Sequence, residues 1–132
     1  MNYLAVLAAA IAAFVVGWLW YGPFFGRQWR TLMGMPEGSM GMPGKIPPAK
    51  AMIGGFVTTL IMIWFLANFM NSLAVSSASQ AAWLGLMVAV GFIGMALINS
   101  VWYEGRSWTL FFINAGHYVV SLIVAALVLF YF

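Results

Sequence analysis

Residues 108–130 read WTLFFINAGHYVVSLIVAALVLF, a run without a single charged residue. A helix that crosses the hydrocarbon core of a bilayer needs about 20 predominantly apolar residues. This stretch meets that length, and its few polar residues are uncharged. The sequence therefore predicts a transmembrane helix here.

Three other stretches have the same character, at about residues 3–21, 51–69 and 81–103. Across the chain, 65% of residues are hydrophobic, only 5% are charged, and the mean hydropathy is +1.02. A soluble domain is about half apolar and about one quarter charged. So few charged residues could not cover the surface of a protein in water. We therefore predict an all-α membrane protein with four transmembrane helices.

These spans occupy most of the 132 residues, which predicts a single domain over 1–132, with the helices arranged as two antiparallel hairpins. The first span differs from a signal peptide because its positive charges follow the apolar run, so we expect it to be retained. Pro23 is expected to end it. The connection 23–50 is rich in Met, Gly and Pro, which predicts a loop with a short interfacial helix near 28–33.

The charged residues indicate an orientation. In a four-span topology, the first and third connections lie on the same side of the membrane. All the basic residues and both acidic ones fall in these connections: Arg27, Arg30, Glu37, Lys45, Lys50, Glu104 and Arg106. The positive-inside rule assigns that side to the cytoplasm. We therefore expect both termini on the opposite, outer side of the membrane.

Two segments, at the expected cytoplasmic ends of the first and third spans, resemble each other. Residues 19–29 read LWYGPFFGRQW and residues 101–108 read VWYEGRSW, and both contain Trp-Tyr, a short gap, Gly-Arg, one residue and Trp. A parallel internal repeat would produce this pattern. Chance is the alternative, because aromatic residues and Arg gather at any cytoplasmic boundary. The candidate boundary cluster comprises Trp20, Arg27, Trp29, Arg30, Glu104, Arg106 and Trp108.

Small residues recur at every fourth position of the first span. They are Ala5, Ala9, Ala13 and Gly17. Helices in lipid associate through close packing and hydrogen bonds, since lipid supplies no hydrophobic drive between them. We expect this helix-packing stripe to contact another span.

Polar residues inside spans are the candidate functional residues. Asn114, His117 and Ser121 share one face of the fourth span. Asn99 lies at a depth similar to that of Asn114, and we expect a hydrogen bond between them across the hairpin. This polar cluster suggests a path from the cytoplasmic side towards His117, which could bind a solute or relay a proton. The structural alternative is a neutral His bonded to Asn or Tyr, which would make helix contacts specific.

The sequence gives no support for enzymatic or metal chemistry. It has no cysteine, nucleophile motif, HExxH motif or phosphate-binding glycine loop. Ser107 and His117 would be roughly 15 Å apart along a helix, too far for a nucleophile–base pair. Four loop methionines, Met33, Met35, Met40 and Met42, are soft donors that could hold Cu(I). Methionine is also common in flexible apolar segments, so we expect no metal, cofactor or catalytic residue.

A family resemblance rests on three stretches. MNYLAVL at 1–7, WLWYGPFFGRQW at 18–29 and EGRSWTLFFINAG at 104–116 resemble bacterial membrane proteins of domain-of-unknown-function family 1761. The resemblance covers nearly the whole chain. It implies a small inner-membrane protein with four helices, and it brings no activity, cofactor or catalytic residue.

Three hypotheses for function follow, of which the third, a membrane enzyme or cofactor holder, has no motif in the sequence to support it. The first is a structural or accessory membrane protein that forms a homo-oligomer, alone or within a larger membrane complex. The second is a small-solute transporter or channel with a polar path along the fourth helix. The expected partners are the lipid bilayer and further copies of the chain. Nucleic acid is not expected, because the basic residues sit beside apolar spans, where they set orientation.

Overall fold

The computed structural model describes residues 2–35 and 46–132. All regular structure in those ranges is helical, and four helices are long and apolar enough to cross a membrane. They cover Tyr3–Phe24, Pro48–Ser72, Ala78–Trp102 and Trp108–Tyr131. The predicted all-α fold with four membrane-spanning helices is confirmed. The loop residues 36–45, which include Glu37, Met40, Met42 and Lys45, lie outside the described residues.

The first span is a continuous helix that changes its winding before it ends. It consists of α1 (Tyr3–Leu19) and the π-helical segment η1 (Trp20–Phe24). Pro23 does not end the span but lies inside η1. Proline lacks an N–H and so cannot donate a backbone hydrogen bond. The helical hydrogen bonding resumes after it, where the Phe25 N–H donates to the Trp20 carbonyl at 2.8 Å. The expected short helix follows as α2 (Gly26–Leu32).

The second span, α3 (Pro48–Ser72), has proline in its first turn, where a missing N–H is harmless. Its end is a Schellman motif. The Val75 N–H donates to the Met70 carbonyl at 3.1 Å, and the Ala74 N–H donates to the Asn71 carbonyl at 3.2 Å. Ala74 takes the left-handed position with φ 51°, where glycine is the usual residue.

The third span contains several short pieces: α4 (Ala78–Val88), the π-helical segment η2 (Ala89–Gly94), α5 (Met95–Leu97) and α6 (Asn99–Trp102). The fourth span is a single helix, α7 (Trp108–Tyr131). A tight turn with Gly105 at φ 69° joins them, and the Ser107 hydroxyl caps α7 by accepting from the Leu110 N–H at 3.0 Å.

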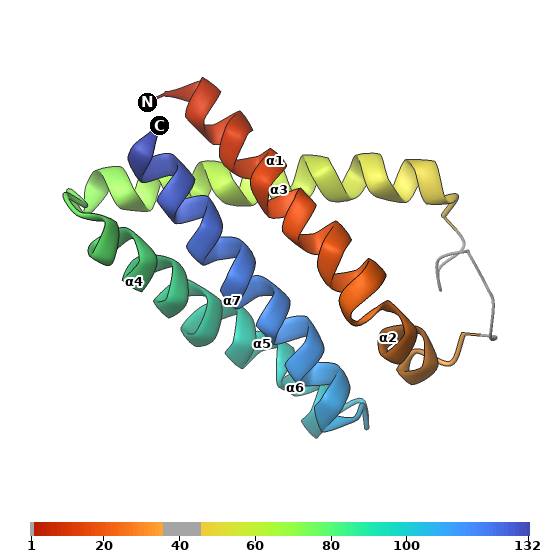
Figure 1. Ribbon diagram of the computed structural model, residues 1–132. Coiled ribbons are helices and arrows are strands. Elements are labelled where there is room, and N and C mark those ends of the chain that lie inside the picture. Colours follow the sequence, from red (N-terminus) through yellow and green to blue (C-terminus); the bar gives the residue numbers. More distant parts are fainter. Residues whose placement is uncertain (1, 36–45) are drawn as a thin grey trace.

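The central helix of the fold is α7, which packs against α1 on one side and α4 on the other. Figure 1 shows these three helices running in similar directions, while α3 passes behind α1 at a wide angle and projects beyond it. The two termini lie close together at one end, and α2 and the α6–α7 turn lie at the other. The first half of α3 is consequently covered on one side only, where Phe56 packs edge-on to Phe14 of α1 with ring centroids 5.6 Å apart.

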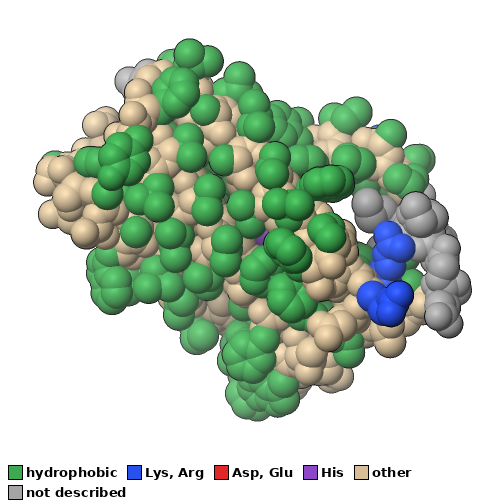
Figure 2. Space-filling model, in the orientation of Figure 1, with side chains coloured by type: hydrophobic (Ala, Val, Ile, Leu, Met, Phe, Trp, Pro, Cys, Tyr) green, Lys and Arg blue, Asp and Glu red, His purple; other side chains and the backbone are tan. Residues whose placement is uncertain are grey.

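Small residues allow the close contacts in the core. Ala9, Ala81, Ala89, Ala125 and Ala126 are fully buried. A Cβ added to Gly85 would lie 2.7 Å from the Leu122 carbonyl oxygen, so α4 and α7 approach to backbone contact there. Figure 2 shows hydrophobic side chains over most of one face of the molecule and Lys or Arg only at one end. Such a surface suits lipid rather than water.

Candidate functional site

The packing stripe of α1 faces α7 and brings the two helices close together. Ala5, Ala9 and Ala13 are each buried to 3% exposure or less. Gly17 continues the stripe, and a Cβ placed there would lie 3.0 Å from His117 Nε2. The glycine therefore makes room for the imidazole ring between α1 and α7.

Two hydrogen bonds from η1 join the first span to the fourth. The Trp20 indole Nε1–H donates to the Ile113 carbonyl at 2.8 Å, and the Tyr21 hydroxyl donates to Asn114 Oδ1 at 2.7 Å. A Cβ on Gly116 would lie 3.0 Å from Trp20 Cζ2, so this glycine provides the space for the indole. Both bonds use side chains of the Trp-Tyr pair that precedes the proline.

Aromatic rings extend the contact around His117. The centroid of the Tyr21 ring lies 5.1 Å from that of His117 and 5.5 Å from that of Trp29 in α2. The centroid of the Tyr118 ring lies 4.8 Å from that of His117. The imidazole thus sits among aromatic rings, and the Tyr21 hydroxyl is bonded to Asn114 rather than to the imidazole.

Two polar atoms of the site are buried without a hydrogen-bond partner: His117 Nδ1 and Ser121 Oγ. Ser121 is 1% exposed. Buried polar side-chain atoms normally have a partner, and leaving one unpaired costs about 1–3 kcal/mol. These atoms are the two places in the site where a small polar molecule would gain hydrogen bonds.

The structure does not bring Asn99 to this cluster. Its side chain is exposed on α6, and Asn114 takes its hydrogen bond from Tyr21 instead. Distance from the hairpin turn sets the depth of a residue along its helix, but not the direction in which its side chain points. The polar site therefore joins the first and fourth spans, where a bond within the second hairpin was expected.

The predicted boundary cluster divides into two groups. Trp20 and Trp29 belong to the contact around Tyr21, and Arg30 is half-buried in the last turn of α2. The others are exposed: Arg27, Glu104, Arg106 and Trp108. Within the described ranges Glu104 forms no ion pair, and Trp108 packs edge-on to Trp102 with centroids 5.3 Å apart.

The sequence did not single out Tyr21 and Gly116 as site residues. Tyrosine is common at the end of a span, so Tyr21 by itself does not indicate a polar contact. The available signal was its place beside Trp20 at the depth of Asn114. Gly116 carries a weaker signal, since a glycine next to a polar face is also common in packing.

Comparison with known proteins gives one match. A family model described as a protein of unknown function (DUF1761) matches residues 4–130. The chain belongs to the DUF1761 family. No curated protein and no solved structure matches it. The matched range of this DUF1761 protein includes every residue of the site from Gly17 to Ser121.

The contacts that the described side chains make within the site are hydrogen bonds and aromatic packing. Among residues 2–35 and 46–132, no three His, Asp or Glu side chains group as metal ligands would. Met33 and Met35 are described, whereas Met40 and Met42 fall outside the described part, so the methionine loop gives no geometry for Cu(I). This DUF1761 site holds two helices together through uncharged groups and leaves two polar atoms unpaired.

Proposed function

We propose that this DUF1761 protein is a structural or accessory protein of the bacterial inner membrane that works as a homo-oligomer. In the orientation proposed, both termini face the periplasm. Arg27, Arg30, Lys50 and Arg106 occur where spans begin or end, away from the termini, and the positive-inside rule favours the cytoplasm for that end.

The use of the polar side chains supports a structural role. Asn114 accepts from Tyr21, and Trp20 donates to the Ile113 carbonyl, so these groups serve contact between helices. A cavity at the end of the fold where the termini meet is lined by other residues. Groups that bind a solute usually converge on a pocket.

The proposal of a homo-oligomer rests on the exposed face of α3. Of the four spans α3 is the least buried, with 11% of its most apolar stretch buried against 22–28% in the others. Gly54 and Thr58 are exposed and lie one turn apart on the first half of α3, and nothing lies within 4 Å of a Cβ added to Gly54. Small residues let helices approach closely in lipid, so this face suits an α3 of a second copy.

The test is the mass of the particle in mild detergent, measured by native mass spectrometry. We expect a homo-oligomer for the wild type and loss of that species in Gly54→Leu, because the larger side chain keeps the helices apart. Gly91→Leu is the matched control, since a Cβ at Gly91 also meets nothing within 4 Å and the residue lies on another span. A wild-type particle of one chain with no bound protein would overturn the proposal.

A solute transporter or channel is the second candidate, and the unpaired atoms of His117 and Ser121 favour it. Ser121→Ala separates the two roles. In a dry contact the change removes an unsatisfied hydroxyl, so stability should stay equal or rise. In a solute or water path the hydroxyl has a partner, so stability should fall. Ser79→Ala, at an exposed position of α4, controls for the general effect of the substitution.

The two hairpins and the internal repeat are finer proposals. Extensive packing between α4 and α7 supports the second hairpin. The internal repeat is supported by the sequence alone, because the two Trp-Tyr pairs have different surroundings in the fold. Trp20 and Tyr21 are half-buried and bonded to α7, whereas Trp102 and Tyr103 are 63% and 85% exposed. Exchange of Trp102-Tyr103 for alanines should therefore leave the fold stable, while the same exchange at Trp20-Tyr21 should not.

A further inference from the structure

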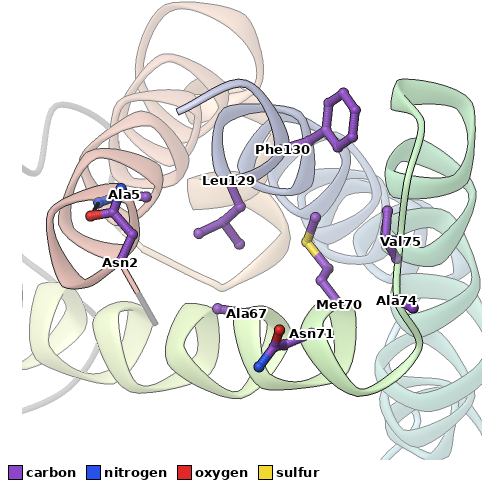
Figure 3. A pocket seen from close by; sticks show the side chains of 9 residues that line it. All are labelled: Asn2, Ala5, Ala67, Met70, Asn71, Ala74, Val75, Leu129 and Phe130. Carbon is purple, nitrogen blue, oxygen red and sulfur yellow. Dashed lines mark hydrogen bonds between the residues drawn. The ribbon is translucent and has the colours of Figure 1, made fainter.

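A cavity of about 330 Å³ opens where the ends of α1, α3 and α7 meet. Figure 3 shows its lining side chains on those helices and on the turn after α3. They are Asn2, Ala5, Ala67, Met70, Asn71, Ala74, Val75, Leu129 and Phe130. The cavity lies beside both termini, at the far end of the fold from α2 and the α6–α7 turn.

The polar part of the lining is uncharged. It consists of the carboxamides of Asn2 and Asn71. The Asn2 Oδ1 accepts from the Ala5 N–H at 3.2 Å, which leaves its amino group to donate elsewhere. Asn71 is exposed, and its carboxamide bonds to no other described residue. The rim therefore offers N–H donors to a ligand that carries hydrogen-bond acceptors.

The rest of the lining is apolar. Met70 and Leu129 reach into the space between α3 and α7 (Figure 3), and Met70 is only 8% exposed. Ala5 and Ala67 are small, which leaves the space open. Ligand pockets generally have volumes of about 300–1,000 Å³. The volume of this cavity is at the lower end of that range and suits one part of a larger molecule.

The depth of the cavity identifies the kind of ligand. Its polar residues sit where α1 begins and α3 ends, so they lie at the boundary between hydrocarbon and headgroups. The ester carbonyls of glycerolipids occupy that depth, directly above the acyl chains. We propose that the cavity holds the upper part of one acyl chain of a glycerophospholipid, with the ester carbonyl accepting a hydrogen bond from the Asn71 carboxamide.

The test uses two lipids that differ only at the proposed acceptor. Dioleoyl phosphatidylcholine carries ester carbonyls, and its diether analogue has the same chains and headgroup without them. Protein exchanged into each lipid and released from mild detergent is analysed by native mass spectrometry, which counts lipids per chain in any oligomer. We expect about three- to ten-fold more retention of the ester lipid, the equivalent of one hydrogen bond.

Asn71→Leu removes the donors while keeping the size of the side chain, and we expect it to abolish the preference for the ester lipid. Asn68→Leu is the matched control, because Asn68 lies one turn earlier on α3, outside the cavity, and donates to the Trp64 carbonyl. It should keep the preference. Equal retention of both lipids by the wild type, or an unchanged preference in Asn71→Leu, would overturn the proposal and leave only lipid held nonspecifically around the helices.

Discussion

The Tyr21 hydroxyl donates to Asn114 Oδ1 at 2.7 Å and joins residues 93 positions apart in the chain. Together with the bond from Trp20 to the Ile113 carbonyl, it connects η1 to the first half of α7. Directional bonds define both the rotation and the depth of the first span relative to the fourth. The alanine stripe of α1 alone would allow sliding, since its residues are alike.

Tyr21→Phe should lower the free energy of unfolding by about 1 kcal/mol, because it leaves Asn114 Oδ1 without its donor inside the membrane. Unfolding in mixed micelles, followed by tryptophan fluorescence, measures this. Tyr103→Phe is the matched control, because Tyr103 is 85% exposed and its hydroxyl makes no hydrogen bond to the described chain. Equal stability of the two variants would contradict a structural role for the Tyr21 bond.

Gly17 and His117 should be energetically coupled. A Cβ on Gly17 would lie 3.0 Å from His117 Nε2, so Gly17→Ala should displace the imidazole and destabilise the fold by about 1–3 kcal/mol. In the background of His117→Ala the same change should cost much less, because the ring is gone. A double-mutant cycle on unfolding free energies measures this coupling. Additive effects would show that the cost of Gly17→Ala does not come from the imidazole.

Gly85→Ala should be more damaging than the same substitution at a glycine that faces open space, such as Gly91. The added Cβ would lie 2.7 Å from the Leu122 carbonyl oxygen, and backbone cannot turn aside as a side chain can. We expect a loss of about 1–3 kcal/mol as α4 and α7 are forced apart. Gly91→Ala, which meets open space, should leave the melting temperature unchanged or slightly higher. Similar melting temperatures for the two variants would argue against the close α4–α7 contact.

The number and approximate position of the spans could be predicted because apolar length is a local property. A bilayer of fixed thickness requires about 20 apolar residues per helix, and the chain has four such runs. The contact face of α1 was predictable for a related reason, since small residues four apart mark one side of a helix. Ala9 and Ala13, chosen from this spacing, are buried in the structure.

The partner of Asn114 could not be predicted, because it depends on how helices are rotated about their axes. Sequence spacing placed Asn99 at the same depth, yet Tyr21 is the residue that faces Asn114. The π-helical segments were missed because they arise from shifts in the backbone bonding pattern, which apolar periodicity does not reveal. The wide crossing of α3 likewise follows from packing of whole helices and leaves no mark on its own sequence.

Ala74 offers a stabilising substitution at the end of α3. It has φ 51° in the Schellman motif, a conformation that costs an L-residue with a Cβ about 1–2 kcal/mol. Glycine takes this conformation freely but is also more flexible in the unfolded chain, so Ala74→Gly should stabilise by about 1 kcal/mol or less. Thermal unfolding in detergent measures the gain. Ala49→Gly, at an exposed position in the regular helix, is the control and should have the opposite sign. A loss of stability in Ala74→Gly would mean that the Ala74 methyl group packs against the cavity beside it, with more benefit than the strain removes.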